Sequence, residues 1–193
     1  GICDTDVLYI WSTFFLYKRQ SNPYTGRFKR IKNPCTGYGV PDRYVGCYGG
    51  TPVAMSYGDV YTSLQTGIID GTENNETALT TGKHGEICKV YSKDEHAMIP
   101  DVMVMSAKIW NTISPEDQQI ILEAAQESTD SHKILWEEAI NDAVEEAKNE
   151  MGVEFVEDVD KDAFREATKG MIEDYCERYP GVAELLDIIE SVK

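Results

Sequence analysis

The sequence predicts an α/β protein in which a mixed sheet with helices is followed by a long linking helix and further C-terminal helices. Residues 1–113 alternate short runs of β-branched and aromatic residues with helical patterns. Residues 114–151 then carry one helical pattern without a breaker. We therefore expect an α/β lobe over residues 1–113 and a mainly helical part over residues 114–193.

The start of the chain is expected to form strands. Residues 7–17 (VLYIWSTFFLY) are rich in β-branched and aromatic residues, which favours one strand or two short ones. Residues 18–26 predict a loop, and residues 27–31 a further strand. The stretch from residue 32 to residue 50 is interrupted by prolines and glycines, so irregular structure is expected there.

The segment that follows predicts a strand and a helix in close succession. Residues 52–57 form an apolar run closed by a tyrosine, and residues 59–66 place apolar side chains at helical spacing. Gly67 then suits the left-handed conformation that ends many helices.

Beyond Gly67 the sequence predicts a short strand and a polar turn. Ile68 and Ile69 favour the strand, and an Asp-Gly pair turns the chain into the polar residues 72–75. Because ligands of α/β proteins usually lie at strand ends, this polar turn is a candidate ligand site. The remaining short elements expected are helices over residues 76–81 and 84–91, strands over 102–105 and 153–156, and helices over 162–179 and 182–192.

One long helix is expected from Ser114 onwards. Serine favours the N-cap and the following proline suits the first helical position. No breaker appears before Gly152, so the helix would span roughly 55 Å and bridge two bodies. The polar residues 128–131 leave a broken or kinked helix as the alternative. The predicted apolar stripe consists of Ile121, Ala125, Ser128, His132, Leu135, Ala139, Ala143, Ala147 and Met151.

Acidic residues are concentrated in the C-terminal part. Residues 114–193 contain 23 Asp and Glu and 7 Lys and Arg, a net charge of −16 that equals the −16 of the whole chain. Such a surface opposes nucleic acid and anionic membranes, so neither partner is expected. The sequence has no run of about 18 apolar residues that could cross a bilayer and does not begin with a signal-peptide pattern.

No catalytic or metal-binding motif is found in the sequence. The five cysteines include no C-x-x-C pair, and the three histidines lack ligand spacing. No serine or cysteine stands in a nucleophile motif, and no glycine-rich loop has the pattern that holds a phosphate. We therefore expect no catalytic residues, no cofactor and no metal. Whether Cys35 and Cys47 form a disulfide is left open.

Three segments resemble, in the same order, the solute-binding proteins of tripartite ATP-independent periplasmic (TRAP) transporters, the DctP-like family. They are GRFKRI at residues 26–31, GGTPVAMSYGDVYTSLQTGIIDGTENN at residues 49–75, and the helix start SPEDQ at residues 114–118. The resemblance implies a periplasmic binding protein-like fold with two α/β lobes around a cleft. It matches the later part of family members, so these residues are expected to supply the second lobe and the long linking helix, without most of the first lobe.

The resemblance also implies four ligand-binding residues. Arg30 would pair with the ligand carboxylate, which a planar guanidinium matches. Asn74 matches the asparagine of the family's D-G-x-E-N turn, with a local Asx-turn role as the alternative. Tyr57 falls where the family places an aromatic side chain against the ligand. Glu73 would face a ligand hydroxyl or a cation, or orient its neighbours, and Asp59 is expected to cap its own helix.

The function implied is the capture of a small organic carboxylate and its delivery to the TRAP membrane permease. One alternative is an enzyme that uses Arg30 with Glu73 or Asp59 as the base. Another is a truncated relative that acts only as an interaction module.

A consequence concerns the middle of the long helix. If it bridges two lobes, Trp136, Ile140 and Val144 would expose apolar surface in these 193 residues, and we expect a homodimer through that surface.

Overall fold

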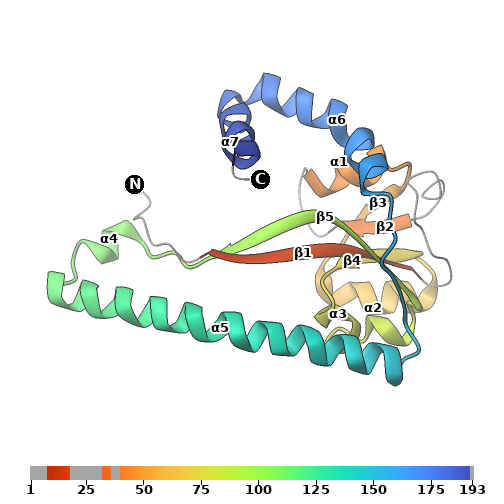
Figure 1. The fold of residues 1–193 in the computed structure, drawn as a ribbon, viewed down its shortest axis with the longest axis horizontal. Helices are drawn as coiled ribbons and strands as arrows, with labels where there is room; N and C mark the ends of the chain where they lie inside the picture. The colour runs from red at the N-terminus through yellow and green to blue at the C-terminus, as the bar shows by residue number, and fades with distance from the viewer. Residues whose placement is uncertain (1–7, 18–31, 36–39, 192–193) are drawn as a thin grey trace.

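The computed structural model describes residues 8–17, 32–35 and 40–191. Two long strands, β1 and β5, run side by side along the long helix α5, and the other strands gather with α1, α2 and α3 at one end of the molecule (Figure 1). The expected α/β class with a mixed sheet is confirmed. The strand predicted over residues 27–31 lies outside the described residues.

The main sheet has four strands in the order β4-β1-β5-β6. They are β1 (Leu8–Tyr17), β4 (Gly71–Asn74), β5 (Val90–Val102) and β6 (Glu154–Val156). β1 is antiparallel to both of its neighbours, whereas β5 and β6 are parallel. The strands predicted over residues 7–17 and 153–156 are therefore confirmed, the first as a single central strand.

β5 contains a bulge opposite β1. Thr13 pairs with Ala97 and Phe15 pairs with Ser92, so the four β5 residues 93–96 lie opposite a single β1 residue, Phe14. Residues 15–17 of β1 pair with both β4 and β5, and residues 8–13 of β1 pair with β5. A bulge bends its strand and redirects side chains, and this one provides two residues of the site described below.

A second sheet consists of two parallel strands, β2 (Lys32–Cys35) and β3 (Thr51–Ala54), and α1 (Val40–Cys47) precedes β3 in the chain. The prediction of irregular structure in this stretch is wrong. Its prolines and glycines are compatible with short elements, because a proline in the first turn of a helix loses no intrahelical hydrogen bond.

Tertiary packing stabilises α1. Val45 is fully buried, and the ring of Tyr48 lies 4.8 Å from that of Phe164 in an edge-on contact. Arg43 also forms an ion pair with Asp174, with 2.6 Å between Nη2 and Oδ2. These contacts with α6 explain why an eight-residue segment of weak helical propensity is helical here.

α2 (Tyr57–Thr66) ends as predicted at Gly67, which has a φ of 80°. The segment after it differs from the prediction. Ile68 is 55% exposed and outside any strand, whereas the predicted polar turn forms strand β4. Pairing with the central strand β1 satisfies the backbone of β4, so its polar residues occupy a buried strand.

The next elements are shorter helices and a longer strand than predicted. α3 (Thr77–Thr80) lies within the helix predicted over residues 76–81, and a single 3₁₀ turn, η2 (His84–Glu86), replaces most of the helix predicted over residues 84–91. β5 already begins at Val90 and ends at Val102, so the strand predicted over residues 102–105 is wrong. Pairing with β1 extends a strand through polar residues that give no strand signal by themselves.

α4 (Ala107–Trp110) precedes the long helix α5 (Pro115–Asn149). The Ser114 side chain accepts a hydrogen bond from the Asp117 N–H at 3.1 Å, which confirms the predicted N-cap. The helix is continuous, so a break at residues 128–131 is not observed.

The inward face of α5 is shifted around the helix from the predicted stripe. Its buried and half-buried residues include Leu122, Ala125, Thr129, His132, Trp136, Ile140, Ala143 and Ala147. Thr129 is accommodated because its hydroxyl donates to the Ala125 carbonyl at 2.8 Å. Leu135, which the stripe included, is 62% exposed.

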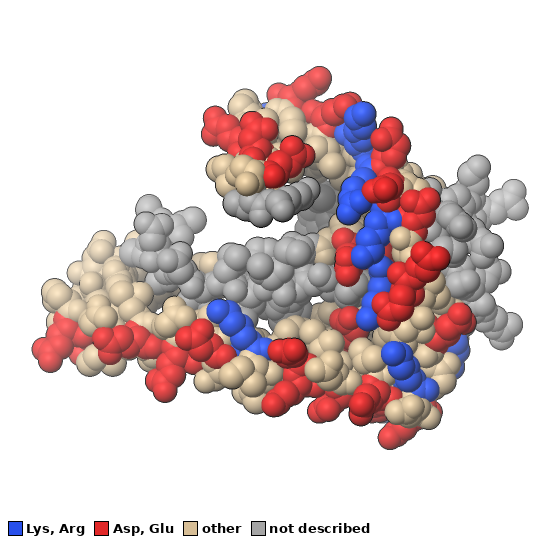
Figure 2. Space-filling view, viewed as in Figure 1, with Lys and Arg blue, Asp and Glu red and all other residues tan. Residues whose placement is uncertain are grey.

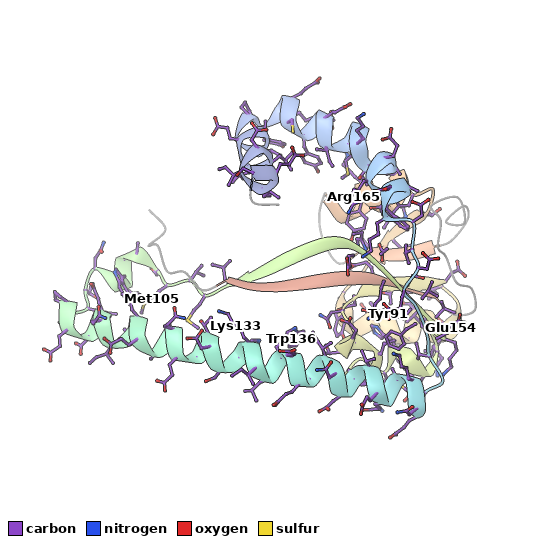
Figure 3. The ribbon with its side chains drawn as sticks, in the orientation of Figure 1. Tyr91, Met105, Lys133, Trp136, Glu154 and Arg165 are labelled. Carbon is purple, nitrogen blue, oxygen red and sulfur yellow. The ribbon has the colours of Figure 1, made fainter. Side chains whose placement is uncertain are left out.

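The expectation of exposed apolar surface along α5 is wrong for its named residues. Trp136, Ile140 and Val144 are half-buried, whereas Ile134 and Leu135 are exposed. Figure 3 shows Trp136 in the middle of α5, with Met105 near α4 at one end of the molecule and Tyr91 inside the body at the other.

The C-terminal helices are α6 (Lys161–Arg178) and α7 (Pro180–Ser191), close to the predicted ranges. Asp160 caps α6 by accepting a hydrogen bond from the Ala163 N–H at 3.0 Å. Acidic side chains line α5 and α6 in Figure 2, as the charge distribution predicts. Among the described residues, no helix is long and apolar enough for a membrane span. Cys47 is a free thiol.

Two apolar clusters pack on opposite faces of the main sheet, because successive strand residues point to opposite sides. The first contains Val60, Leu64, Ile69, Leu79, Cys88, Tyr91, Ala147 and Val153. The second contains Val45, Tyr48, Val90, Val159 and Phe164. α2, α3 and the end of α5 thus cover the Tyr91 face, and α1 and α6 cover the Val90 face. The division after residue 113 stays a prediction.

Candidate ligand-binding site

The four predicted ligand-binding residues fall in different places. Arg30 lies outside the described residues. Glu73 and Asn74 are neighbours in β4, and Tyr57 is the first residue of α2. Because neighbours in a strand point to opposite faces, Glu73 faces α1 and Asn74 faces the side covered by α2 and α3.

Glu73 belongs to a buried polar cluster with Asp94 and His96. The His96 Nδ1 lies 2.7 Å from an Asp94 carboxylate oxygen, and the His96 Nε2 lies 4.0 Å from a Glu73 carboxylate oxygen. The side chains of His96 and Asp94 are fully buried, and that of Glu73 is 9% exposed. The ring of Tyr44 lies 5.0 Å from that of His96. Both nitrogens of one imidazole therefore face carboxylates.

The bulge in β5 brings Asp94 and His96 into this cluster. Between them, Glu95 has a φ of 52°, in the left-handed region that is uncommon for residues other than glycine. Its side chain forms an ion pair with Lys161 at the start of α6. Asp94 and His96 were missed in the sequence, where the only signal was a polar Asp-Glu-His run before the apolar residues 97–99.

Burial raises the pKa of Glu73 to about 7. His96 lowers the pKa of this carboxyl and Asp94 raises it, both by smaller amounts than burial does. A carboxyl of this kind gains or loses its proton near neutral pH.

Asn74 is half-buried, with its side chain engaged locally. Its Oδ1 accepts a hydrogen bond from the Asn75 N–H at 2.9 Å, and its carbonyl oxygen accepts one from the Tyr91 hydroxyl at 3.3 Å. The bond to Asn75 holds the side-chain amide in a defined orientation, and it reaches the next residue rather than residue 76, as an Asx-turn would. The ligand-binding role of Asn74 stays a prediction. The side chain of the next residue, Asn75, accepts a hydrogen bond from the Thr77 N–H at the start of α3, at 3.1 Å.

Tyr57 is 48% exposed, and its ring lies 5.6 Å from that of buried His84. It shares the sheet face of Asn74, so the structure places these two predicted residues on one side of the sheet and Glu73 on the other. The prediction that Asp59 caps α2 is wrong. The N-cap is Ser56, whose hydroxyl donates to the Asp59 carboxylate at 2.7 Å, because the helix begins two residues earlier than predicted.

Within the described part of the chain, no group of three or more His, Cys, Asp or Glu side chains has an arrangement that could hold a metal ion. Asp59 is exposed at the first turn of α2, on the other side of the sheet from Glu73, so the two carboxylates named as alternative bases lie in separate places.

Comparison with known proteins places the chain in a family. The profile of the bacterial extracellular solute-binding proteins, family 7 (DctP), matches residues 38–178. The uncharacterized protein YiiZ of Salmonella typhimurium is 40% identical over 145 residues, which are 75% of this chain and 44% of that protein. The 2,3-diketo-L-gulonate-binding periplasmic protein YiaO of Escherichia coli is 31% identical over 147 residues, 76% of this chain and 44% of that protein.

Solved structures show the same relationship. A TRAP periplasmic solute-binding protein from Chromohalobacter salexigens, with bound D-glucuronate, matches with a TM-score of 0.90 and 25% identity over 96% of this chain and 62% of its own. The protein from Anaerococcus prevotii, with bound D-glucuronate, matches with a TM-score of 0.89 and 32% identity over 95% of this chain and 59% of its own.

The chain thus spans less than half of the curated relatives in sequence and about 60% of the solved structures. The family, YiaO and the solved relatives are described as solute-binding proteins rather than enzymes. The periplasmic location implied by the TRAP resemblance agrees with their names. The profile covers most of the chain and the solved structures share its fold, so this chain belongs to the DctP family of bacterial extracellular solute-binding proteins.

Proposed function

We propose that the chain forms part of a TRAP solute-binding protein that captures a hexuronate and delivers it to a membrane permease. The observation that carries this proposal is the structural match to TRAP proteins with bound glucuronate or galacturonate, at TM-scores of 0.87 to 0.90 for three of them. A uronate combines a carboxylate with a sugar ring, which agrees with the organic carboxylate expected from the sequence.

Asn74 and Tyr57 are the described residues best placed to contact such a ligand. Both belong to the face of the sheet covered by α2, and Tyr57 keeps about half of its surface exposed. An aromatic ring and an oriented amide are the groups that a sugar ring and its hydroxyls require. Glu73 is buried with His96 and Asp94 on the opposite face of the sheet. In this proposal it stabilises the strand that carries Asn74 and does not touch the ligand.

Arg30 is proposed to pair with the carboxylate of the uronate, on the resemblance of the GRFKR segment and the geometry of a guanidinium. Binding would then close two lobes around the ligand, because contacts from both walls favour the closed form of an existing equilibrium. The closed form would be the one presented to the permease.

We predict weak but specific binding of D-glucuronate to the 193-residue chain. The chain covers about 60% of the solved relatives, so one wall of the implied cleft is represented and the carboxylate keeps a solvated ion pair worth about 0 to 1 kcal/mol. A two-dimensional ¹⁵N NMR titration at millimolar D-glucuronate should shift the amide signals around Tyr57 and Asn74, whereas a thermal-shift screen of organic acids should show no large change.

D-glucose is the matched control, since it has the same ring without the carboxylate and should leave these signals in place. Equal shifts with both sugars, or shifts confined to other parts of the chain, would contradict the proposal. Absence of any ligand effect would favour the interaction-module alternative. A thermal shift of the size expected for saturated tight binding, about 2.7 kcal/mol at a hundredfold excess over Kd, would show that the site is complete within these residues.

The homodimer stays a prediction. The large apolar residues exposed on α5 are Ile120, Ile121, Ile134 and Leu135, rather than the three named from the sequence. Sedimentation analysis of the chain at micromolar concentration would decide between a monomer and a dimer.

A further inference from the structure

A short turn packs against the ring of Tyr57. It comprises residues 82–86, between α3 and β5, and includes the 3₁₀ turn η2. We call it the 82–86 turn. Lys83 within it has a φ of 57°, so its backbone adopts a conformation that non-glycine residues take only when their surroundings hold it.

Within this turn, the side chain of His84 contacts the Tyr57 ring. It is 1% exposed, its ring lies 5.6 Å from that of Tyr57 at an interplanar angle of 51°, and its Nδ1 has no hydrogen-bond partner. Burial lowers the pKa of His84 to about 4, so the imidazole is neutral at physiological pH. With its Nδ1 lacking a hydrogen-bond partner, the imidazole contacts Tyr57 through its ring.

Gly82 leaves the space that the Tyr57 hydroxyl occupies. A Cβ atom at this position would lie 2.5 Å from the Tyr57 hydroxyl oxygen, 2.8 Å from the Ala78 carbonyl oxygen and 3.1 Å from the His84 Nε2. Side-chain carbons do not approach other heavy atoms so closely, so any residue other than glycine would displace Tyr57 or the turn.

The turn contacts α2 at a second point. Tyr61, one helical turn after Tyr57, donates its hydroxyl to the Glu86 carboxylate at 2.6 Å. The first two turns of α2 therefore rest on the 82–86 turn through two tyrosines. Residues four apart lie on the same side of a helix, which is why both reach the same turn.

The other side of the turn is tied to the end of α5. The Lys89 ammonium donates to the Gly85 carbonyl at 2.8 Å and to the Met151 carbonyl at 2.6 Å. A Cβ on Gly85 would lie 2.6 Å from the Met151 sulfur, so the turn and the chain after α5 are in close contact. The turn is thus held against the chain segment that directly follows α5.

We propose that the 82–86 turn positions Tyr57 for ligand binding, with Gly82 and His84 as its positioning residues. The turn fixes the position and orientation of the tyrosine ring. Through the hydrogen bonds of Lys89 it also fixes the position of that ring relative to Met151, just after α5. The proposal rests on the role of Tyr57 in the function proposed above, and its first test uses no ligand.

The first test places 3-fluorotyrosine at position 57 and records its ¹⁹F NMR signal in the free protein. Gly82→Ala should shift or split the signal, because the added carbon competes with the hydroxyl for the same space. His84→Leu keeps a side chain of similar size next to the Tyr57 ring but replaces the flat imidazole, so it should shift the signal as well. Gly58→Ala is the control, since its Cβ would meet one atom, the Ser56 hydroxyl, at an ordinary 3.9 Å.

The second test measures D-glucuronate affinity by the NMR titration. Gly82→Ala should weaken binding by about tenfold, a loss of about 1.4 kcal/mol. The same change in a Tyr57→Phe background, which lacks the hydroxyl, should cost less than a further twofold. A structural effect unrelated to Tyr57 would cost the same in both backgrounds.

The two tests separate the positioning role from the proposed function. Unchanged fluorine signals in folded Gly82→Ala and His84→Leu proteins would overturn the positioning role. If Gly82→Ala fails to fold, the signal of His84→Leu decides alone. Fluorine signals that move while affinity stays the same would support the positioning role and count against Tyr57 as a ligand residue.

Discussion

Replacing Arg30 with alanine is expected to weaken ligand binding by about 30-fold or more in a protein that carries both lobes. Removing one partner of a desolvated charge pair costs about 2 to 5 kcal/mol, because the ligand carboxylate is left buried without its counter-charge. The expectation rests on the position of Arg30 in the GRFKR segment and on the carboxylate common to the uronates bound by the solved relatives.

Two variants serve as controls for this experiment. Arg30→Lys keeps the charge but loses the planar fork, so it should recover little of the lost affinity. Arg27→Ala removes a neighbouring charge from the same segment and should change the affinity by less than about threefold, in keeping with the small effects of solvated charges. Calorimetry with D-glucuronate that finds Arg30→Ala as tight as the parent would remove Arg30 from the site.

The second large effect is expected in the pH dependence of stability, where two buried groups act in opposite directions. His84 has a pKa of about 4 in the folded protein against an ordinary 6.5, because burial disfavours its charged form. Glu73 has a pKa of about 7 against an ordinary 4.5, again mainly because of burial. Each shift corresponds to about 3 kcal/mol of unfolding free energy.

The signs follow from which state binds more protons. Between pH 6.5 and about 4 the unfolded chain protonates His84 and the folded chain does not, so stability falls as the pH is lowered through this window. Between pH 4.5 and about 7 the folded chain holds a proton on Glu73 that the unfolded chain has lost, so stability falls as the pH is raised. In the parent protein the two slopes offset each other between about pH 4.5 and 6.5.

Single substitutions should therefore reveal opposite slopes. With Glu73→Gln the slope of His84 remains, so this variant should gain about 3 kcal/mol relative to the parent between pH 4.5 and 7. With His84→Leu the slope of Glu73 remains, so this variant should lose stability relative to the parent as the pH rises from 4 to 6.5. Urea unfolding of the three proteins at half-unit steps would measure both differences, from which groups common to all three cancel.

Parallel curves for the parent and Glu73→Gln would mean that the Glu73 carboxyl ionises normally, with its charge compensated inside the folded protein. Parallel curves for the parent and His84→Leu would likewise show that water or another group reaches the His84 ring. Either result would contradict the corresponding prediction without affecting the other.

The sequence predicted well those elements whose signals are local. Ser114 and Pro115 marked the start of α5 correctly, because a side-chain cap and a proline at the first helical position act within one turn. Gly67 ends α2 as expected, since a left-handed residue favours glycine wherever it occurs. The segments that resemble the TRAP family also indicated the fold class and the family, both of which the comparisons confirm.

The candidate site was predicted only in part. Glu73, Asn74 and Tyr57 were proposed as ligand-binding residues through the resemblance, which gave no sign that they lie on two faces of the sheet. Asp94 and His96 were missed because a bulge in β5 brings them to Glu73, and a bulge depends on the partner strand. The role of Arg30 stays a proposal, since it lies outside the described residues.

The sequence by itself determined where the long helix begins and ends, the class of the fold and the position of the acidic surface, because capping, hydrophobic periodicity and charge are properties of nearby residues. Tertiary structure decided that a polar segment became the buried strand β4, that α1 formed among glycines and prolines, and which side of α5 faces inward. In each of these cases the backbone or side chain is satisfied by a partner distant in sequence, and pairing or burial with that partner outweighs local propensity.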